Sequence, residues 1–291
     1  TALAGGVGAA RFLSGLVDVV DPTDITVIVN TGDDETFHGL RVCPDLDSVT
    51  YRLAGAANPE TGWGLVDETF TTMDALDRYG APTWFRLGSR DLATHLFRTE
   101  RLRAGVSLSD VTAEITRAWV LTLRVLPMSN DTIATRISAL VDDTPTNFAM
   151  QEWFVREHAE PPITDVRFDG AADAQPAPGV LDAIRDAETI IVCPSNPLIS
   201  IGPILAVPGV RDALIAARDR VVAVSPLISG RAVKGPADRM LDALGIETSC
   251  VGVARLYAEW CATIVIDDED AAQADAITAL GLRPVITDTL M

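Results

Sequence analysis

Cysteine and histidine are scarce in this sequence, which contains four cysteines and three histidines in 291 residues. No two cysteines form a C-x-x-C pair, and no Cys/His cluster has the spacing of a zinc site. Neither a zinc centre nor a redox pair is therefore predicted. We expect all four cysteines to be reduced core residues of a cytoplasmic protein, namely Cys43, Cys193, Cys250 and Cys261.

Basic residues are also in short supply, because 23 Lys and Arg stand against 41 Asp and Glu, for a formal net charge of −18. Nucleic acids and anionic membranes are bound through basic faces, so we predict neither as a partner. No apolar run reaches the length of about 20 residues that a membrane-spanning helix needs. A hydrophobic content of 48% is ample for a large core. We expect a single domain over residues 1–291.

A glycine-rich turn opens the chain. A short apolar run ends in Gly5, Gly6 and Gly8, and an amphipathic helix follows. Strand, glycine turn and helix in this order expose backbone N–H groups to an anion, and the missing Cβ atoms let a phosphate approach. Arg11 stands where a dinucleotide fingerprint has its third glycine, and no Gly-Lys-Ser/Thr follows. The alternative is a tight turn that binds nothing.

Short, continuously apolar segments recur along the chain and alternate with helical segments, which is typical of buried parallel strands. The fold class expected is α/β, Rossmann-like, with a mostly parallel sheet and helices on both faces. The segment at roughly 56–175 breaks this rhythm with three helices and a β-rich patch. We expect it to be an inserted α+β subdomain that binds substrate. The expected strands are residues 1–4, 25–29, 189–192, 221–224, 263–266 and 283–287.

Carboxylates gather after the second expected strand. Asp33 and Asp34 follow that strand directly, and Asp45 and Asp47 precede a helix expected from about Ser48 to Ala54. The negative charges of these carboxylates and of a nearby phosphate would repel one another unless a cation compensates them. Mg²⁺ is suited to this place because it prefers hard oxygen ligands. A magnesium site is therefore predicted here, with helix capping alone as the alternative.

Two further clusters carry polar groups suited to phosphate. Arg90 is expected at the mouth of a helix, where a guanidinium can bind phosphate with two hydrogen bonds. His95, one turn further along, is either a packing residue or a base. Residues 194–204 form a rigid, donor-rich loop where a helix would normally start. Residues 225–230 resemble that loop, and the two are expected to enclose a nucleotide diphosphate together with the glycine turn.

Six motifs together resemble the 2-phospho-L-lactate transferase family of coenzyme F-420 biosynthesis. The resemblance extends over essentially the whole chain, and the order of the motifs makes it specific. Actinobacterial members use an enolpyruvyl substrate. The motifs are residues 4–13 (AGGVGAARFL), 42–47 (VCPDLD), 87–95 (LGSRDLATH), 126–131 (LPMSND), 151–156 (QEWFVR) and 194–204 (PSNPLISIGPI).

This resemblance implies a reaction. A phosphoenolpyruvyl or 2-phospho-L-lactyl group would pass from its GDP-activated form to the terminal hydroxyl of the deazaflavin Fo, with release of GMP. The family is Mg²⁺-dependent and usually dimeric, so a homodimer is expected.

The resemblance and the residue pattern together give roles to residues. Asp45, Asp47 and Arg90 would be catalytic. The resemblance implies that Fo contacts Asp47 (or Asp45) and Arg90, with His95 beside them. The metal would be held by Asp33 and Asp45, and the sequence leaves open which aspartate binds the metal and which orients the attacking hydroxyl. The nucleotide phosphates would be bound by Gly5, Gly6, Gly8, Ser195, Asn196, Pro197, Ser200 and Gly202.

Two other functions are weighed against the transferase. Regulatory proteins that bind UDP-sugars without turnover have a similar fold, but the VCPDLD and RDLATH motifs suit Fo and metal better. A nicotinamide-dependent oxidoreductase would need an acidic residue at the end of the second strand to bind the ribose. That strand ends instead in Val29-Asn30-Thr31-Gly32.

Overall fold

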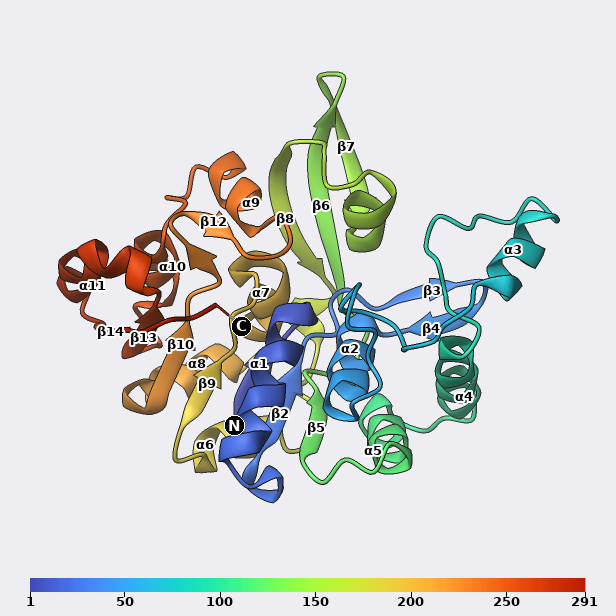
Figure 1. The fold of residues 1–291 in the computed structure, drawn as a ribbon, viewed down its shortest axis with the longest axis horizontal. Coiled ribbons are helices and arrows are strands. Elements are labelled where there is room, and N and C mark those ends of the chain that lie inside the picture. Colours follow the sequence, from blue (N-terminus) through green and yellow to red (C-terminus); the bar gives the residue numbers. More distant parts are fainter. Residues whose placement is uncertain (291) are drawn as a thin grey trace.

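The computed structural model describes residues 1–290 and is organised around a seven-stranded parallel sheet (Figure 1). The strand order is β14-β13-β10-β9-β1-β2-β5. The expected α/β, Rossmann-like class is therefore confirmed. The strands of this sheet are β1 (Ala2–Ala4), β2 (Thr26–Val29), β5 (Arg124–Pro127), β9 (Ile190–Val192), β10 (Val221–Val224), β13 (Thr263–Ile266) and β14 (Arg283–Ile286).

Both faces of the sheet are covered because successive apolar side chains of a strand point to opposite sides. Ala2 and Ala4 pack with helices α1 and α2, whereas Leu3 packs with α6, α7 and α8 on the other face. The four cysteines are buried and free, as expected. The helices are α1 (Gly6–Val19), α2 (Pro44–Leu53), α3 (Thr71–Asp77), α4 (Asp91–Arg103), α5 (Leu108–Ala118), α6 (Val180–Asp186), α7 (Gly202–Ala206), α8 (Val210–Ala216), α9 (Ala237–Ala243), α10 (Cys250–Tyr257) and α11 (Ala274–Ala279).

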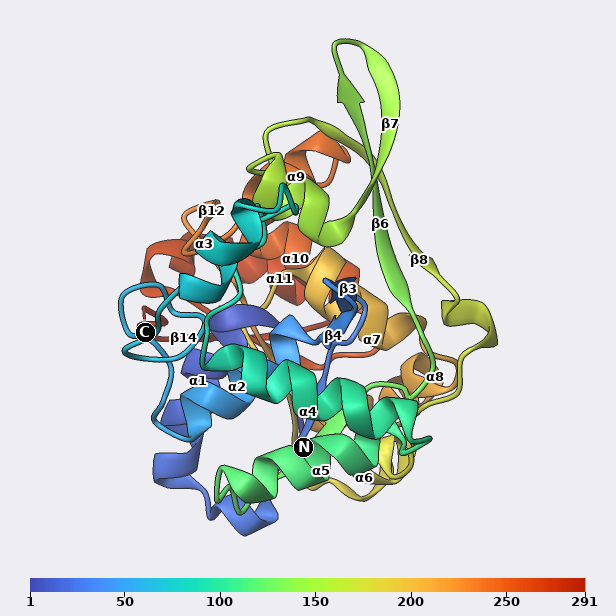
Figure 2. The ribbon, with the colours of Figure 1, turned by 90° about the vertical axis from the view of Figure 1, so that its right-hand side faces the viewer.

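The smaller sheets lie outside this core. A three-stranded antiparallel sheet projects from the body as an arm, and the hairpin of β3 and β4 extends beside α4 (Figures 1 and 2). Within the range 56–175, β5 pairs with β2 in the central sheet, so part of this range belongs to the core. The remaining strands are β3 (Glu35–Phe37), β4 (Leu40–Val42), β6 (Ala134–Val141), β7 (Thr144–Ala149), β8 (Ile163–Asp169), β11 (Leu227–Ile228) and β12 (Arg231–Ala232).

The direction of strand addition reverses at β1. From β1 the chain adds β2 and β5 on one side, and it later adds β9, β10, β13 and β14 on the other. In open parallel sheets, ligands bind in the crevice that opens at the carboxyl ends of the strands at such a switch point. The two loops that flank this crevice are the glycine turn after β1 and residues 194–201 after β9.

Two local expectations need correction. Helix α2 begins at Pro44 rather than near Ser48, because proline fits the first turn of a helix. Asp45 and Asp47 therefore lie within that turn. Residues 194–204 are not an open loop throughout, because Pro197–Ile201 form a π-helical turn that continues into α7.

No single helix in residues 1–290 is long and apolar enough to cross a bilayer, although one bent pair, Pro197–Ala206 with Val210–Ala216 at 94°, passes the same test of length and composition.

Candidate functional site

The glycine turn and the loop after β9 pack directly on each other. A Cβ on Gly5 would lie 2.6 Å from the Cβ of Ser200, and one on Gly8 would lie 2.6 Å from the carbonyl oxygen of Pro194. The Ser195 hydroxyl donates to the Gly5 carbonyl oxygen at 2.9 Å. Two of the three glycines are thus required by contact between the loops, in addition to any role toward a ligand.

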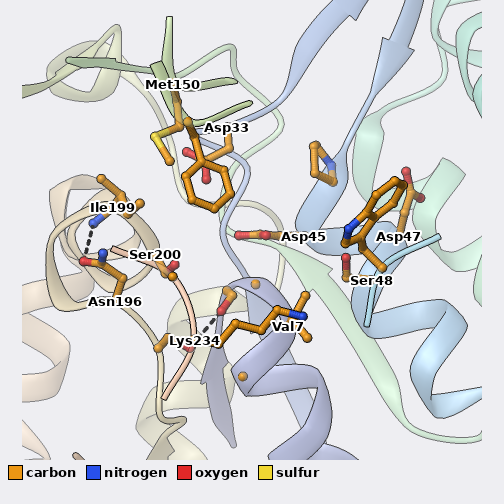
Figure 3. Close-up of a pocket in the computed structure, with 18 of the residues that line it drawn as sticks. Val7, Asp33, Asp45, Asp47, Ser48, Met150, Asn196, Ile199, Ser200 and Lys234 are labelled. Carbon is orange, nitrogen blue, oxygen red and sulfur yellow. Dashed lines mark hydrogen bonds between the residues drawn. The ribbon is translucent and has the colours of Figure 1, made fainter. Parts of the chain in front are cut away.

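A cavity of about 460 Å³ opens at this switch point (Figure 3). It is bordered by the two loops, the first turn of α2, and more distant segments that reach over the sheet edge. The structure thus brings together most of the residues that the sequence predicted for the site. Those that line the cavity are Gly5, Gly6, Gly8, Asp33, Asp45, Asp47, His95, Ser195, Asn196 and Ser200.

Three predicted site residues do not line the cavity. Pro197 is buried at the start of the π-helical turn, and Gly202 packs against Phe168, whose Cζ would lie 2.9 Å from an added Cβ. Arg90 is exposed, and its guanidinium donates to the Val66 carbonyl oxygen at 2.7 Å. Arg86, four residues upstream, lines the cavity in its place.

Asp33 and Asp45 form a buried acidic pair. Asp45 accepts a hydrogen bond from Asn30 Nδ2 at 2.9 Å and another from the Gly6 backbone. Burial raises the pKa of Asp45 to about 6. Burial, and then the charge of Asp45, raise the pKa of Asp33 well above its ordinary value. The pair therefore needs a proton or a cation to be stable in this place.

The surroundings of this pair fit a hard cation. Within residues 1–290, no basic side chain lies within 4.0 Å of either carboxylate, and Asp33 Oδ1 is buried without a hydrogen-bond partner. Carboxylate oxygens that lack a protein donor are suitable ligands for Mg²⁺. Figure 3 shows Asp45 between Asp33 on one side and Asp47 on the other.

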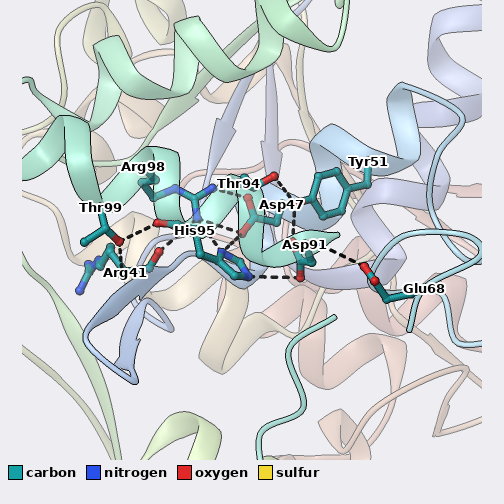
Figure 4. Close-up of polar contacts among 9 residues, drawn as sticks. All are labelled: Arg41, Asp47, Tyr51, Glu68, Asp91, Thr94, His95, Arg98 and Thr99. Atoms are coloured by element: carbon teal, nitrogen blue, oxygen red, sulfur yellow. Dashed lines mark hydrogen bonds and ion pairs between the residues drawn. The ribbon is translucent and has the colours of Figure 1, made fainter. Parts of the chain in front are cut away.

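Asp47 belongs to a second buried network, which contains its own cation (Figure 4). The Arg98 side chain is buried and binds both oxygens of Asp47, with Nη1 at 3.1 Å from Oδ2. His95 lies between the two acids, with Nδ1 3.7 Å from Asp47 Oδ2 and Nε2 3.2 Å from Asp91 Oδ2. Tyr51 donates to Asp91. Burial acts to raise the pKa of Asp91, but the hydrogen bond and charge of His95, together with the hydrogen bond of Tyr51 and the charge of Arg98, outweigh it and lower the pKa.

Asp47, Asp91 and His95 could also hold a metal ion, because one ligand atom from each lies within 4.8 Å of the others. Arg98 already compensates the charge of Asp47 there. The Asp33–Asp45 pair has no such partner among residues 1–290, so it is the stronger candidate for a cation.

Sequence reasoning missed two parts of the cavity. One is an apolar side formed by Trp63, Phe85, Met150 and Phe154, which come from three separate segments. The other is Lys234, which lies between β12 and α9. The sequence does single out Lys234, since it is the only lysine among the 23 basic residues of the chain.

Asp34, next to the acidic pair, makes stability depend on pH. Burial raises its pKa to about 7, against the opposing effect of the Arg41 guanidinium at 3.3 Å. Because the pKa of Asp34 is raised in the folded state, the contribution of Asp34 to the free energy of unfolding is complete at low pH. It is lost as the pH rises from about 4 to about 7. Relative to wild type, Asp34→Asn should therefore gain about 2–3 kcal/mol in free energy of unfolding between pH 5 and pH 8.

Urea denaturation in the presence of a chelator at both pH values measures this gain. Asp74→Asn is the matched control, because Asp74 is exposed and pairs with Arg86 at 3.1 Å on the surface. A difference between Asp34→Asn and wild type that stays constant with pH would contradict the prediction.

The fold and the cavity define a Rossmann-like α/β protein whose candidate site lies at the switch point of a parallel sheet. Within that class the profile of the family "2-phospho-L-lactate transferase CofD" matches residues 1–290, and the chain belongs to this family. It is accordingly a transferase of coenzyme F-420 biosynthesis.

Similar proteins agree with this assignment. A phosphoenolpyruvate transferase of Streptomyces griseus is 45% identical over 97% of this chain and 89% of its own length. One of Thermobifida fusca is 47% identical over 92% of this chain and 86% of its own length. The crystal structure of protein BH3568 from Bacillus halodurans has the same fold, with a TM-score of 0.62 and 18% identity over 100% of this chain and 92% of that one.

Proposed function

We propose that this protein transfers a phosphoenolpyruvyl group from its GDP-activated form to the terminal hydroxyl of Fo, in the cytoplasm and as a homodimer. The observation that carries the proposal is that one cavity joins a helix N-terminus, a buried acidic pair and an apolar side. The enolpyruvyl donor, rather than a 2-phospho-L-lactyl donor, is favoured by the printed names of relatives about 45% identical to this chain.

The phosphate side of the cavity is built by the turn between β1 and α1. Gly6 has a φ of +74°, and its N–H is directed to Asp45. The N–H groups that follow in the first turn of α1 have no acceptor within the helix. They are suited to the diphosphate of the donor, with Ser195, Asn196 and Ser200 on the facing loop. Asn196 Oδ1 also caps the turn that follows by accepting from the Leu198 N–H at 2.9 Å.

Asp33 and Asp45 are the residues that would hold Mg²⁺. When bound, the ion would neutralise charge on the diphosphate. The chain's part includes fixing the Asp45 carboxylate, which it does through Asn30 and the Gly6 backbone.

The acceptor is proposed to lie on the apolar side. Trp63, Phe85 and Phe154 offer flat surfaces to the deazaflavin ring. Asp47, held in place by Arg98, would accept a hydrogen bond from the attacking hydroxyl, and His95 lies beside it. The hydroxyl oxygen bonds to the β-phosphorus, the bond to GMP breaks with its electron pair on GMP, and the proton passes to Asp47. Arg90 enters this proposal only if Fo extends past the cavity edge.

Mass spectrometry of the product tests the proposal. Fo is incubated with Mg²⁺ and either the enolpyruvyl or the lactyl form of the activated guanylate. We expect GMP and a phosphodiester that is two hydrogen atoms lighter than the lactyl product. Product from the lactyl donor alone would overturn the choice of donor, and no product from either would overturn the reaction.

A further inference from the structure

Lys234 occupies a special position at the edge of the cavity. It lies between β12 and α9, on a segment whose residues Val233 and Gly235 also line the cavity. Figure 3 shows its side chain running along the glycine turn toward Val7. The ammonium donates a hydrogen bond of 2.6 Å to the carbonyl oxygen of Thr61. Thr61 belongs to the loop of residues 58–64, which follows α2 in the chain.

Three segments that are distant in the sequence meet at this ammonium group. A Cβ on Gly62 would lie 2.8 Å from Lys234 Nζ and 2.9 Å from Val7 Cγ1. Gly62 also has a φ of +77°, which other residues rarely adopt. A glycine is thus what lets the loop 58–64 close down on the lysine and the glycine turn together. Trp63 of the same loop lines the cavity.

Among the residues that the structure describes, no acidic side chain pairs with Lys234. Partial burial, and then the nearby charge of Arg11, lower its pKa. Lys234 and Arg11 therefore lie near each other, and both line the cavity. An ammonium has three N–H donors, and the bond to Thr61 uses one of them.

We propose that Lys234 is the positioning residue for the diphosphate of the nucleotide donor. Two of its donors bind oxygens of the β-phosphate while the third keeps its bond to Thr61, so that the bound diphosphate holds the loop 58–64 closed over the ligand. The inference rests on the proposed function for the nature of the ligand. Its test uses GDP and GMP alone, without transfer.

Calorimetric titration of Lys234→Met with GDP and GMP tests the inference. A hydrogen bond to a charged group corresponds to about a 10- to 100-fold change in affinity, so GDP should bind that much more weakly while GMP is unaffected. Arg231→Met is the matched control, because Arg231 is exposed, three residues away and outside the cavity lining. Equal affinity of wild type and Lys234→Met for GDP would overturn the inference, as would failure of wild type to bind GDP.

Two further measurements use properties particular to this lysine. Lys234 is the only lysine of this sequence, so an amine-specific acylating reagent reports on it directly, and GDP, but not guanosine, should protect it. Saturating GDP should also slow hydrogen exchange over residues 58–64 in wild type but not in Lys234→Met. Unchanged labelling in the presence of GDP would overturn the inference. GDP binding that depends on Lys234, without transfer to Fo, would overturn the proposed function alone.

Discussion

Replacing Asp45 by Asn is expected to slow GMP release by about a hundredfold to a thousandfold, the range seen when one preorganised electrostatic group is removed from a reacting site. The change removes one of the two negative charges of the Asp33–Asp45 pair and keeps the shape of the side chain. In the wild type Asn30 donates a hydrogen bond of 2.9 Å to Asp45, and the amide oxygen of the variant side chain can still accept it. The fold should therefore survive while the Mg²⁺ concentration for half-maximal rate rises steeply. Steady-state rates at graded Mg²⁺ measure both effects.

Asp91→Asn provides the comparison for this experiment, because Asp91 belongs to the alternative metal group with Asp47 and His95. It should leave the Mg²⁺ requirement unchanged. The opposite result, with Asp45→Asn normal and Asp91→Asn impaired in its response to Mg²⁺, would move the metal to that second group. Circular dichroism of both variants separates a loss of metal from a loss of structure.

Replacing Arg98 by Met should destabilise the protein by about 3–5 kcal/mol, because it leaves the buried charge of Asp47 without its partner. Arg98 is 1% exposed and Asp47 is 5% exposed, so water can replace little of what the guanidinium contributes. Urea denaturation near neutral pH measures the loss. Activity should fall as well, since Arg98 sets the position of Asp47 in the cavity.

Two variants control for this result. Arg101→Met changes an arginine of the same helix, but Arg101 pairs with Glu114 at 2.6 Å on the surface, so a much smaller cost in stability is expected. Adding Asp47→Asn to Arg98→Met should recover part of the lost stability, because it removes the uncompensated charge. A double variant no more stable than Arg98→Met would show that packing, rather than charge, accounts for the loss.

The residues with a local signature were predicted from the sequence. Gly5, Gly6 and Gly8 were found because a glycine turn between a strand and a helix has a recognisable pattern. Asp33, Asp45 and Asp47 were found because they lie close to the ends of expected elements, and such ends collect at one edge of a parallel sheet. The parallel sheet itself followed from the alternation of apolar strands and helices.

Arg90 shows where this reasoning reaches its limit. A residue at a helix start can be placed along the chain, but the direction of its side chain depends on what packs around it. The Arg90 guanidinium is taken up by the Val66 carbonyl oxygen, and Arg86 lines the cavity. No local pattern identified Arg98 as the partner of Asp47, because 51 residues separate the two in the sequence.

The sequence by itself thus determined the class of fold, the family and the chemical character of the glycine turn, since these depend on short-range patterns and on motif order. Only the tertiary structure decided which groups share the cavity, because contacts between distant segments depend on packing rather than on spacing. It separated an uncompensated pair, Asp33 and Asp45, from the compensated Asp47, although Asp45 and Asp47 are two residues apart. It also placed Lys234 against Thr61 and Val7, where three distant segments meet.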